Sequence, residues 1–236
     1  MAALAPDDPL LTAARVVVLD ACSTLDVIRI PVRSEWSADA ESVQQVLAIA
    51  GDASALLLSI PEAIEAEYQK HSQGTVEGVL NELRKHHNTV TIEARFMKDL
   101  LRRCGVTADE LPTIDLPSDW AETLAAQFAN LGADVRTKLT LVPHDEDDVT
   151  PAYSRIAKSR APAVQGAVGM NDSTLCEVAL RIARQRPPGT TGLLTSNDKD
   201  FRQSGSLHPQ LVADYDAGGL VDLPTWRDAL MFARAE

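Results

Sequence analysis

Aromatic residues are scarce in this chain, which has four Phe, three Tyr and three Trp among its 236 residues. Proteins that hold single-stranded nucleic acid by stacking need several aromatic side chains together, and the sequence shows no such platform. Cationic residues are also few: 22 Lys and Arg stand against 34 Asp and Glu, a formal net charge of −12. This charge argues against a protein that coats nucleic acid non-specifically, but not against an enzyme that handles RNA or DNA in one cleft.

Cysteine is scarce too, and the three residues Cys22, Cys104 and Cys176 have neither CxxC nor Cys/His metal-ligand spacing. We therefore expect reduced thiols in a cytoplasmic protein. No apolar stretch approaches the length of a membrane span, and the first residues lack the basic and apolar segments of a signal peptide. These absences predict a chain with no membrane partner.

The chain does contain alternating strand-like and helix-like segments. Short apolar runs and helical spacing predict strands at residues 15–19, 55–59, 191–196 and 211–213, and helices at about 38–50, 61–71, 172–186 and near 226–231. Such alternation predicts an α/β protein in which an open parallel sheet is covered by helices on both faces, a three-layer α/β/α fold.

One segment departs from this alternation. From about 75 to 142 the pattern is helical and more polar, with a break between Leu111 and Pro117. We interpret it as a helical insertion that could cover the active cleft, within a single domain spanning residues 1–236.

Acidic residues occur in four short motifs spread over most of the chain. Asp20 follows the first strand, Glu65 and Glu67 lie in the helix after the second, Asp172 opens a later helix, and Asp198 and Asp200 follow another strand. In open parallel sheets the site lies at the carboxyl ends of the strands, where a fold can gather such residues. Gathered carboxylates repel one another unless a divalent cation lies between them. The pattern therefore predicts a Mg²⁺- or Mn²⁺-dependent phosphodiesterase.

The order and flanks of these motifs resemble the PIN-domain nucleases, which include the toxin ribonucleases of toxin–antitoxin pairs. The matching stretches are Val16–Asp20, Pro61–Glu67, Asn171-Asp172 and Thr195–Phe201, and the ending Leu220–Trp226 is similar to a large-type subgroup. The resemblance implies a PIN-like fold and hydrolysis of RNA by water activated at carboxylate-bound Mg²⁺ or Mn²⁺. It also leaves open an antitoxin protein as a partner, and a homodimer.

The resemblance implies roles for single residues as well. Its spacing favours Glu67 as a metal ligand, with Glu65 as the alternative, and it keeps both Asp198 and Asp200 beside Asp20 and Asp172. Glu177 is a secondary candidate, because it lies about 500° round the helix from Asp172 and does not share its face squarely.

Further residues are candidates for holding the substrate. Arg155 and Arg160 are candidate phosphate contacts, and Asn197 is a candidate for orienting a ligand or the scissile phosphate. The bland alternatives are a solvated basic stretch for the arginines and a turn for Asn197. Asp172 could simply favour a helix N-terminus, and Asn171 could cap it.

Two rival functions stay open. The run Val18–Leu25 resembles the first motif of haloacid-dehalogenase-like phosphatases, with Asp20 as nucleophile, but Cys22 stands where those phosphatases carry their general acid. The second rival is a catalytically silent PIN-like module that binds RNA or a protein. Metal-dependent cleavage of RNA, hydrolysis of a phosphate monoester, or neither would discriminate these three functions.

Overall fold

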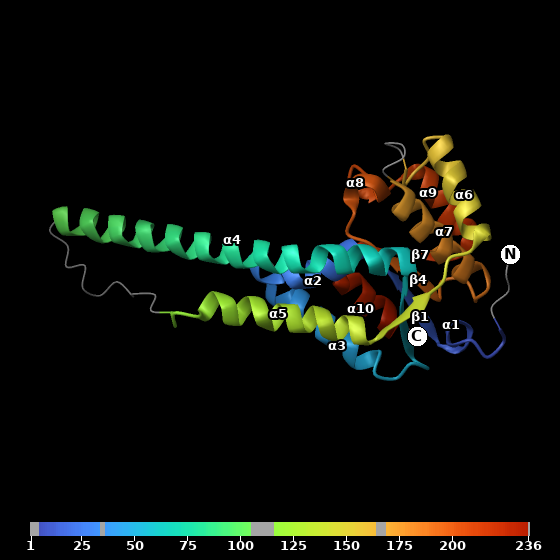
Figure 1. Ribbon diagram of the computed structural model, residues 1–236, viewed down its shortest axis with the longest axis horizontal. Helices are drawn as coiled ribbons and strands as arrows, with labels where there is room; N and C mark the ends of the chain where they lie inside the picture. The colour runs from blue at the N-terminus through green and yellow to red at the C-terminus, as the bar shows by residue number, and fades with distance from the viewer. Residues whose placement is uncertain (1–4, 34–35, 105–115, 164–168, 236) are drawn as a thin grey trace.

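The computed structural model of the chain describes residues 5–33, 36–104, 116–163 and 169–235. Its centre is a sheet of five parallel strands in the order β3-β2-β1-β4-β7 (Figure 1). The strands of this sheet are β1 (Arg15–Leu19), β2 (Leu56–Pro61), β3 (Leu139–Val142), β4 (Thr191–Leu194) and β7 (Leu220–Leu223). A separate antiparallel pair consists of β5 (Arg202–Gln203) and β6 (Ser206–Leu207).

Helices account for most of the remaining described residues. They are α1 (Pro9–Thr12), α2 (Ala21–Arg29), the 3₁₀ turn η1 (Ile30–Val32), α3 (Trp36–Ile49), α4 (Glu62–Arg103), α5 (Trp120–Thr137), α6 (Glu146–Ala157), α7 (Met170–Arg184), α8 (Asp198–Phe201), α9 (Pro209–Gly218) and α10 (Trp226–Arg234). None of the described helices is long and apolar enough to cross a membrane.

The first strand shows why the sheet has helices on both faces. Val16 and Val18 pack with apolar residues of α7 and α9, whereas Val17 and Leu19 pack with those of α3 and α10. Successive side chains of a strand point to opposite faces, so an unbroken apolar run requires cover on both sides. The α/β class and the parallel sheet are therefore as predicted, and the arrangement is compatible with three α/β/α layers.

Three predicted elements need correction. Residues 211–213 form part of helix α9, which begins at Pro209 after the His208 cap and ends at Gly219 in the left-handed region (φ +67°). Pro at the first helical position and Gly after the last one outweigh the short apolar run. The segment 139–142, placed in the helical insertion, is the edge strand β3. The strand predicted at 55–59 continues through Pro61.

The insertion contains a long helical hairpin. Helix α4 runs unbroken for 42 residues, so no boundary falls near residue 75, and it packs against α5 and α2. Figure 1 shows α4 and α5 side by side, extending away from the body of the molecule. The first turns of α4 lie beside the sheet, while its far end projects outward instead of covering the body. The break predicted at 111–117 falls mostly outside the described residues.

The strand order defines where a site can lie. The chain adds β2 and β3 on one side of β1, then returns to add β4 and β7 on the other side. The switch point of the topology is thus between β1 and β4, and ligands of open parallel sheets bind beyond the carboxyl ends of the strands at such a point.

Candidate active site

Asp20 lies at this switch point, directly after β1. Its backbone N–H donates to the carbonyl oxygen of Leu194 at the end of β4, at 3.0 Å. Its side chain is buried, and Oδ2 accepts a hydrogen bond from Thr195 Oγ1 at 2.8 Å. The backbone N–H of Asn197 donates to the same Thr195 oxygen at 3.1 Å. The loop after β4 therefore fixes the orientation of the Asp20 carboxylate.

Asp172 and Asp200 meet at the side chain of Asn197. Asp172 lies in the first turn of α7, and Asp200 lies in α8. The Asn197 amide nitrogen donates to Asp172 Oδ1 at 3.2 Å and to Asp200 Oδ2 at 3.1 Å. One neutral NH₂ group thus bridges two carboxylates. This is more than the turn-forming role that Asn197 could have had alone.

Glu67, in the second turn of α4, brings the fourth carboxylate. Its Oε2 accepts from the amide of Asn171 at 2.8 Å. The proposed capping role of Asn171 is wrong, because α7 has Gly169 at its N-cap. Asn171 instead links the start of α7 to α4, although the two segments are more than 100 positions apart in the chain.

The electrostatics of these four carboxylates are unusual. Within the described part of the chain, none of the four forms an ion pair with Lys, Arg or His. Burial raises the pKa of Asp20 to about 6, the negative charge of Glu67 adds to the rise, and the Thr195 hydroxyl partly offsets it. Burial, followed by the charges of Asp20 and Asp200, raises the pKa of Asp172 to about 7. The cluster carries uncompensated negative charge.

Binding of a metal ion at this cluster depends on the type of donor atom and on how the donors are arranged. Carboxylate oxygens are the donors that Mg²⁺ and Mn²⁺ prefer, and the mutual repulsion is what a cation relieves. Among the described residues, however, no group of three or more His, Cys, Asp or Glu side chains is arranged so that it could hold a metal ion. The donor chemistry fits a hard cation, while the side-chain positions do not form a ready cage.

Two of the carboxylates named from the sequence lie elsewhere. Glu65 is buried against α5, where its Oε1 pairs with Arg136 Nε at 2.6 Å. The side chain of Asp198 is 78% exposed and pairs with Arg202 at 3.2 Å. Arg202 also binds the carbonyl oxygen of Thr195 and the Asp222 carboxylate, so it fastens the β4–α8 loop to β7. Of the alternatives left open, the structure brings Glu67 and Asp200 to Asp20 and Asp172.

Arg155 and Glu177 form a separate, interior ion pair. Arg155 is 6% exposed; its guanidinium binds Glu177, Asp214 and the carbonyl oxygen of Ala161. A side chain that is buried and fully engaged cannot reach a substrate at the surface, so the predicted phosphate contact does not match this position. Glu177, held by Arg155, does not join the carboxylate cluster. Arg160 is half-exposed and lies 3.5 Å from Asp214.

Sequence reasoning gave no role to Thr195, although its hydroxyl holds Asp20. The available signal was position: Thr195 lies near the end of the strand predicted at residues 191–196, just as Asp20 lies at the end of the first strand. Ser23 was also missed, and its hydroxyl accepts from the backbone N–H of Ser196 at 3.0 Å. Both contacts join segments more than 170 positions apart, which local patterns do not reveal.

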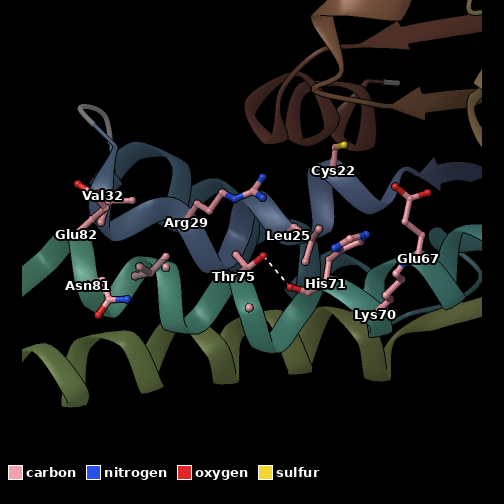
Figure 2. Close-up of a pocket in the computed structure, with 13 residues that line it drawn as sticks. Cys22, Leu25, Arg29, Val32, Glu67, Lys70, His71, Thr75, Asn81 and Glu82 are labelled. Atoms are coloured by element: carbon pink, nitrogen blue, oxygen red, sulfur yellow. Dashed lines mark hydrogen bonds between the residues drawn. The ribbon is translucent and has the colours of Figure 1, made fainter. Parts of the chain in front are cut away.

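A groove of about 760 Å³ begins at this cluster and runs between α2 and α4. Figure 2 shows Glu67 and Cys22 at one end of the groove and Val32, Asn81 and Glu82 at the other. Burial and the neighbouring carboxylates raise the pKa of the Cys22 thiol to about 12, so it stays protonated at neutral pH.

Comparisons of the chain with models of protein families, with curated proteins and with solved structures find no match.

Proposed function

We propose that the protein is a metal-dependent nuclease of the PIN type that hydrolyses phosphodiester bonds of RNA. The observation that carries this proposal is the meeting of Asp20, Glu67, Asp172 and Asp200, from four separate elements, at the switch point of a parallel sheet. Within the parts of the chain that the structure describes, their side-chain hydrogen-bond partners are all neutral donors. A cluster of carboxylates in which burial raises the pKa of two members, Asp20 and Asp172, is typical of a functional site rather than of a structural one.

The proposal assigns each polar neighbour a positioning role. Thr195 holds the Asp20 carboxylate, Asn197 keeps Asp172 and Asp200 together, and Asn171 ties Glu67 to α7. The four carboxylates would hold the cation, which when bound supplies an activated water and stabilises charge on the leaving oxygen. An antitoxin partner, a homodimer and a cytoplasmic location stay predictions of the sequence.

A catalytically silent module is the second candidate, and one observation favours it. The described residues contain no ready metal-holding group. Such a module would retain the fold and bind RNA without cutting it. The phosphatase alternative gains no such support, because a Cys22 thiol with a pKa near 12 is a poor general acid.

Cleavage of a fluorescently labelled single-stranded RNA in Mn²⁺, in Mg²⁺ and in EDTA tests the proposal. We expect cleavage by the parent in the presence of either metal and none in EDTA. Asp20→Asn should lower the rate by at least about a thousand-fold, which corresponds to ~4 kcal/mol of transition-state stabilisation. Asp198→Asn, the same chemical change two residues from Asp200, should leave the rate unchanged.

Three outcomes would overturn the proposal. Equal rates for the parent and Asp20→Asn, purified in parallel, would assign the cleavage to a contaminant or to another site. A parent that binds the RNA but never cuts it would favour the silent module. Hydrolysis of p-nitrophenyl phosphate, abolished by Asp20→Asn, would instead favour the phosphatase.

A further inference from the structure

The groove between α2 and α4 is continuous with the carboxylate cluster. Glu67 contributes to both, and Cys22 lies two residues after Asp20. From this end the groove follows α4 for about four turns, as far as Glu82 (Figure 2). A polymer whose scissile bond lies at the cluster would therefore find a path along α4.

Cationic side chains line the near and middle parts of the groove. Arg29 comes from α2 and Lys70 comes from α4; His71 of α4 also lines the groove. Lys70 and His71 are exposed, and Arg29 is half-exposed while it pairs with Asp26 at 3.2 Å. In a chain with a formal net charge of −12, cationic groups next to an uncompensated acidic cluster favour a polyanion that extends beyond the cluster.

Two glycines in α4 provide independent support. Gly74 and Gly78 are four residues apart, on one helix face, and both line the groove. A glycine inside a helix costs about 0.5–1 kcal/mol relative to alanine. A Cβ built at either position would meet no atom of the residues that the structure describes within 4 Å, so packing among those residues does not require glycine there. Glycine also permits close approach of a ligand to the helix backbone.

We propose that this groove binds the sugar-phosphate backbone of a single RNA strand on one side of the bond that is cut. The inference rests on the proposed function, because it places the reacting phosphate at the carboxylate cluster. Lys70 and Arg29 contact phosphates, and the bare backbone at Gly74 and Gly78 leaves room for the strand. Asp20 is buried, so a phosphate approaches it from a recess, which a single strand can enter more readily than a duplex.

Binding of a fluorescein-labelled twelve-uridine RNA, measured by anisotropy over a KCl series, tests the groove. The assay uses the full chain with the Asp20→Asn change and no added divalent metal, so that cleavage does not interfere. Lys70→Gln should weaken binding and lower the slope of log Kd against log salt by about 0.7, the value for one phosphate contact on a single strand. The matched control is Lys138→Gln, an exposed lysine just before β3 that does not line the groove, which should change neither quantity.

Steric blockage gives a second measurement that does not depend on charge. The double variant Gly74→Gln and Gly78→Gln places good helix formers in the groove and should bind the RNA at least about ten-fold more weakly. Its thermal midpoint should not fall, which separates blockage from misfolding. Ala94→Gln, on the exposed part of α4 beyond the groove, should bind like the parent.

The result that overturns the inference is unchanged RNA affinity in both the glycine and the lysine variants, as expected if the groove holds a protein partner instead. This failure is distinct from failure of the proposed function. Cleavage that depends on Asp20, with groove variants binding like the parent, rejects the groove alone. Groove-dependent RNA binding without metal-dependent cleavage by the protein that retains Asp20 rejects the nuclease and keeps the groove.

Discussion

Two groups of charged residues lie along the same helix, α7: a buried group further along it, and the half-buried Asp172 at its start. Further along the helix, Glu177 pairs with Arg155, and Arg181 binds the Asp148 carboxylate at 2.8 Å. At the start of α7, Asp172 has the neutral amide of Asn197 as its one side-chain hydrogen-bond partner among the described residues. Buried charges that serve the fold are normally paired. The unpaired set is therefore the one whose charge the fold leaves available for another use.

The two groups also differ in how the removal of one charge changes the free energy of unfolding. In the interior network each carboxylate is paired with a guanidinium. Removal of the cation leaves a carboxylate unpaired in the interior and therefore lowers the stability of the fold. In the carboxylate cluster the charges oppose one another, so removal of one anion relieves the fold. The three changes below test this contrast, beginning with the largest expected effect on stability.

Arg155→Met should lower the free energy of unfolding by about 3–5 kcal/mol, because it leaves Glu177 and Asp214 without the cation that binds both. Urea denaturation followed by circular dichroism measures the loss. Arg84→Met is the matched control, since Arg84 pairs with Glu122 on the surface of the hairpin and exposed pairs contribute about 0–1 kcal/mol. Similar losses in the two variants would contradict the contrast between interior and surface pairs.

Asp172→Asn should act in the opposite direction and raise stability at pH 7 in metal-free buffer. The pKa of Asp172 rises from 3.8 to about 7 on folding, so between about pH 4 and 7 the folded chain retains a proton that the unfolded chain has lost. The parent therefore loses stability as pH rises through this window, and the variant lacks this loss. With allowance for solvent screening of the half-buried carboxylate, the gain is about 1–3 kcal/mol at pH 7.

The same urea denaturation at pH 4 provides the internal control. There Asp172 is protonated in the folded chain and about two-fifths protonated in the unfolded chain, so folding takes up less than one proton and the variant should differ little from the parent. A variant that is less stable than the parent at pH 7, or a difference that does not grow from pH 4 to pH 7, would show that Asp172 carries no electrostatic strain.

The sheet was predictable where the pattern was local. The run Val16–Leu19 is apolar and mostly β-branched, which predicts β1 and places Asp20 at its end. The edge strand β3 was missed because its four residues, only one of them fully buried, follow directly on the helix α5. The short apolar run at residues 211–213 predicts a strand, whereas Pro209 at the first helical position and Gly219 after the last one favour the helix that forms.

The candidate site was predictable as a set of carboxylates but not in every member. Glu65 and Glu67 are about 200° apart round α4, and only the packing of α5 decides which of them pairs with Arg136. The burial of Arg155 depends on Glu177 and Asp214, which lie 22 and 59 positions further along the chain. Such partners are set by the tertiary fold. A single sequence does not reveal them.

Asp198 and Asp200 provide the finest test of the same contrast. Asp198 is exposed, and its carboxylate pairs with Arg202. Without Asp198, Arg202 would still bind the Asp222 carboxylate and the Thr195 carbonyl oxygen. Asp198→Ala should therefore change the free energy of unfolding by less than about 0.5 kcal/mol and leave RNA cleavage intact. Asp200→Ala should abolish cleavage, because it removes a member of the cluster. Urea denaturation and the labelled-RNA assay measure both variants, and a loss of cleavage in Asp198→Ala alone would reverse the assignment.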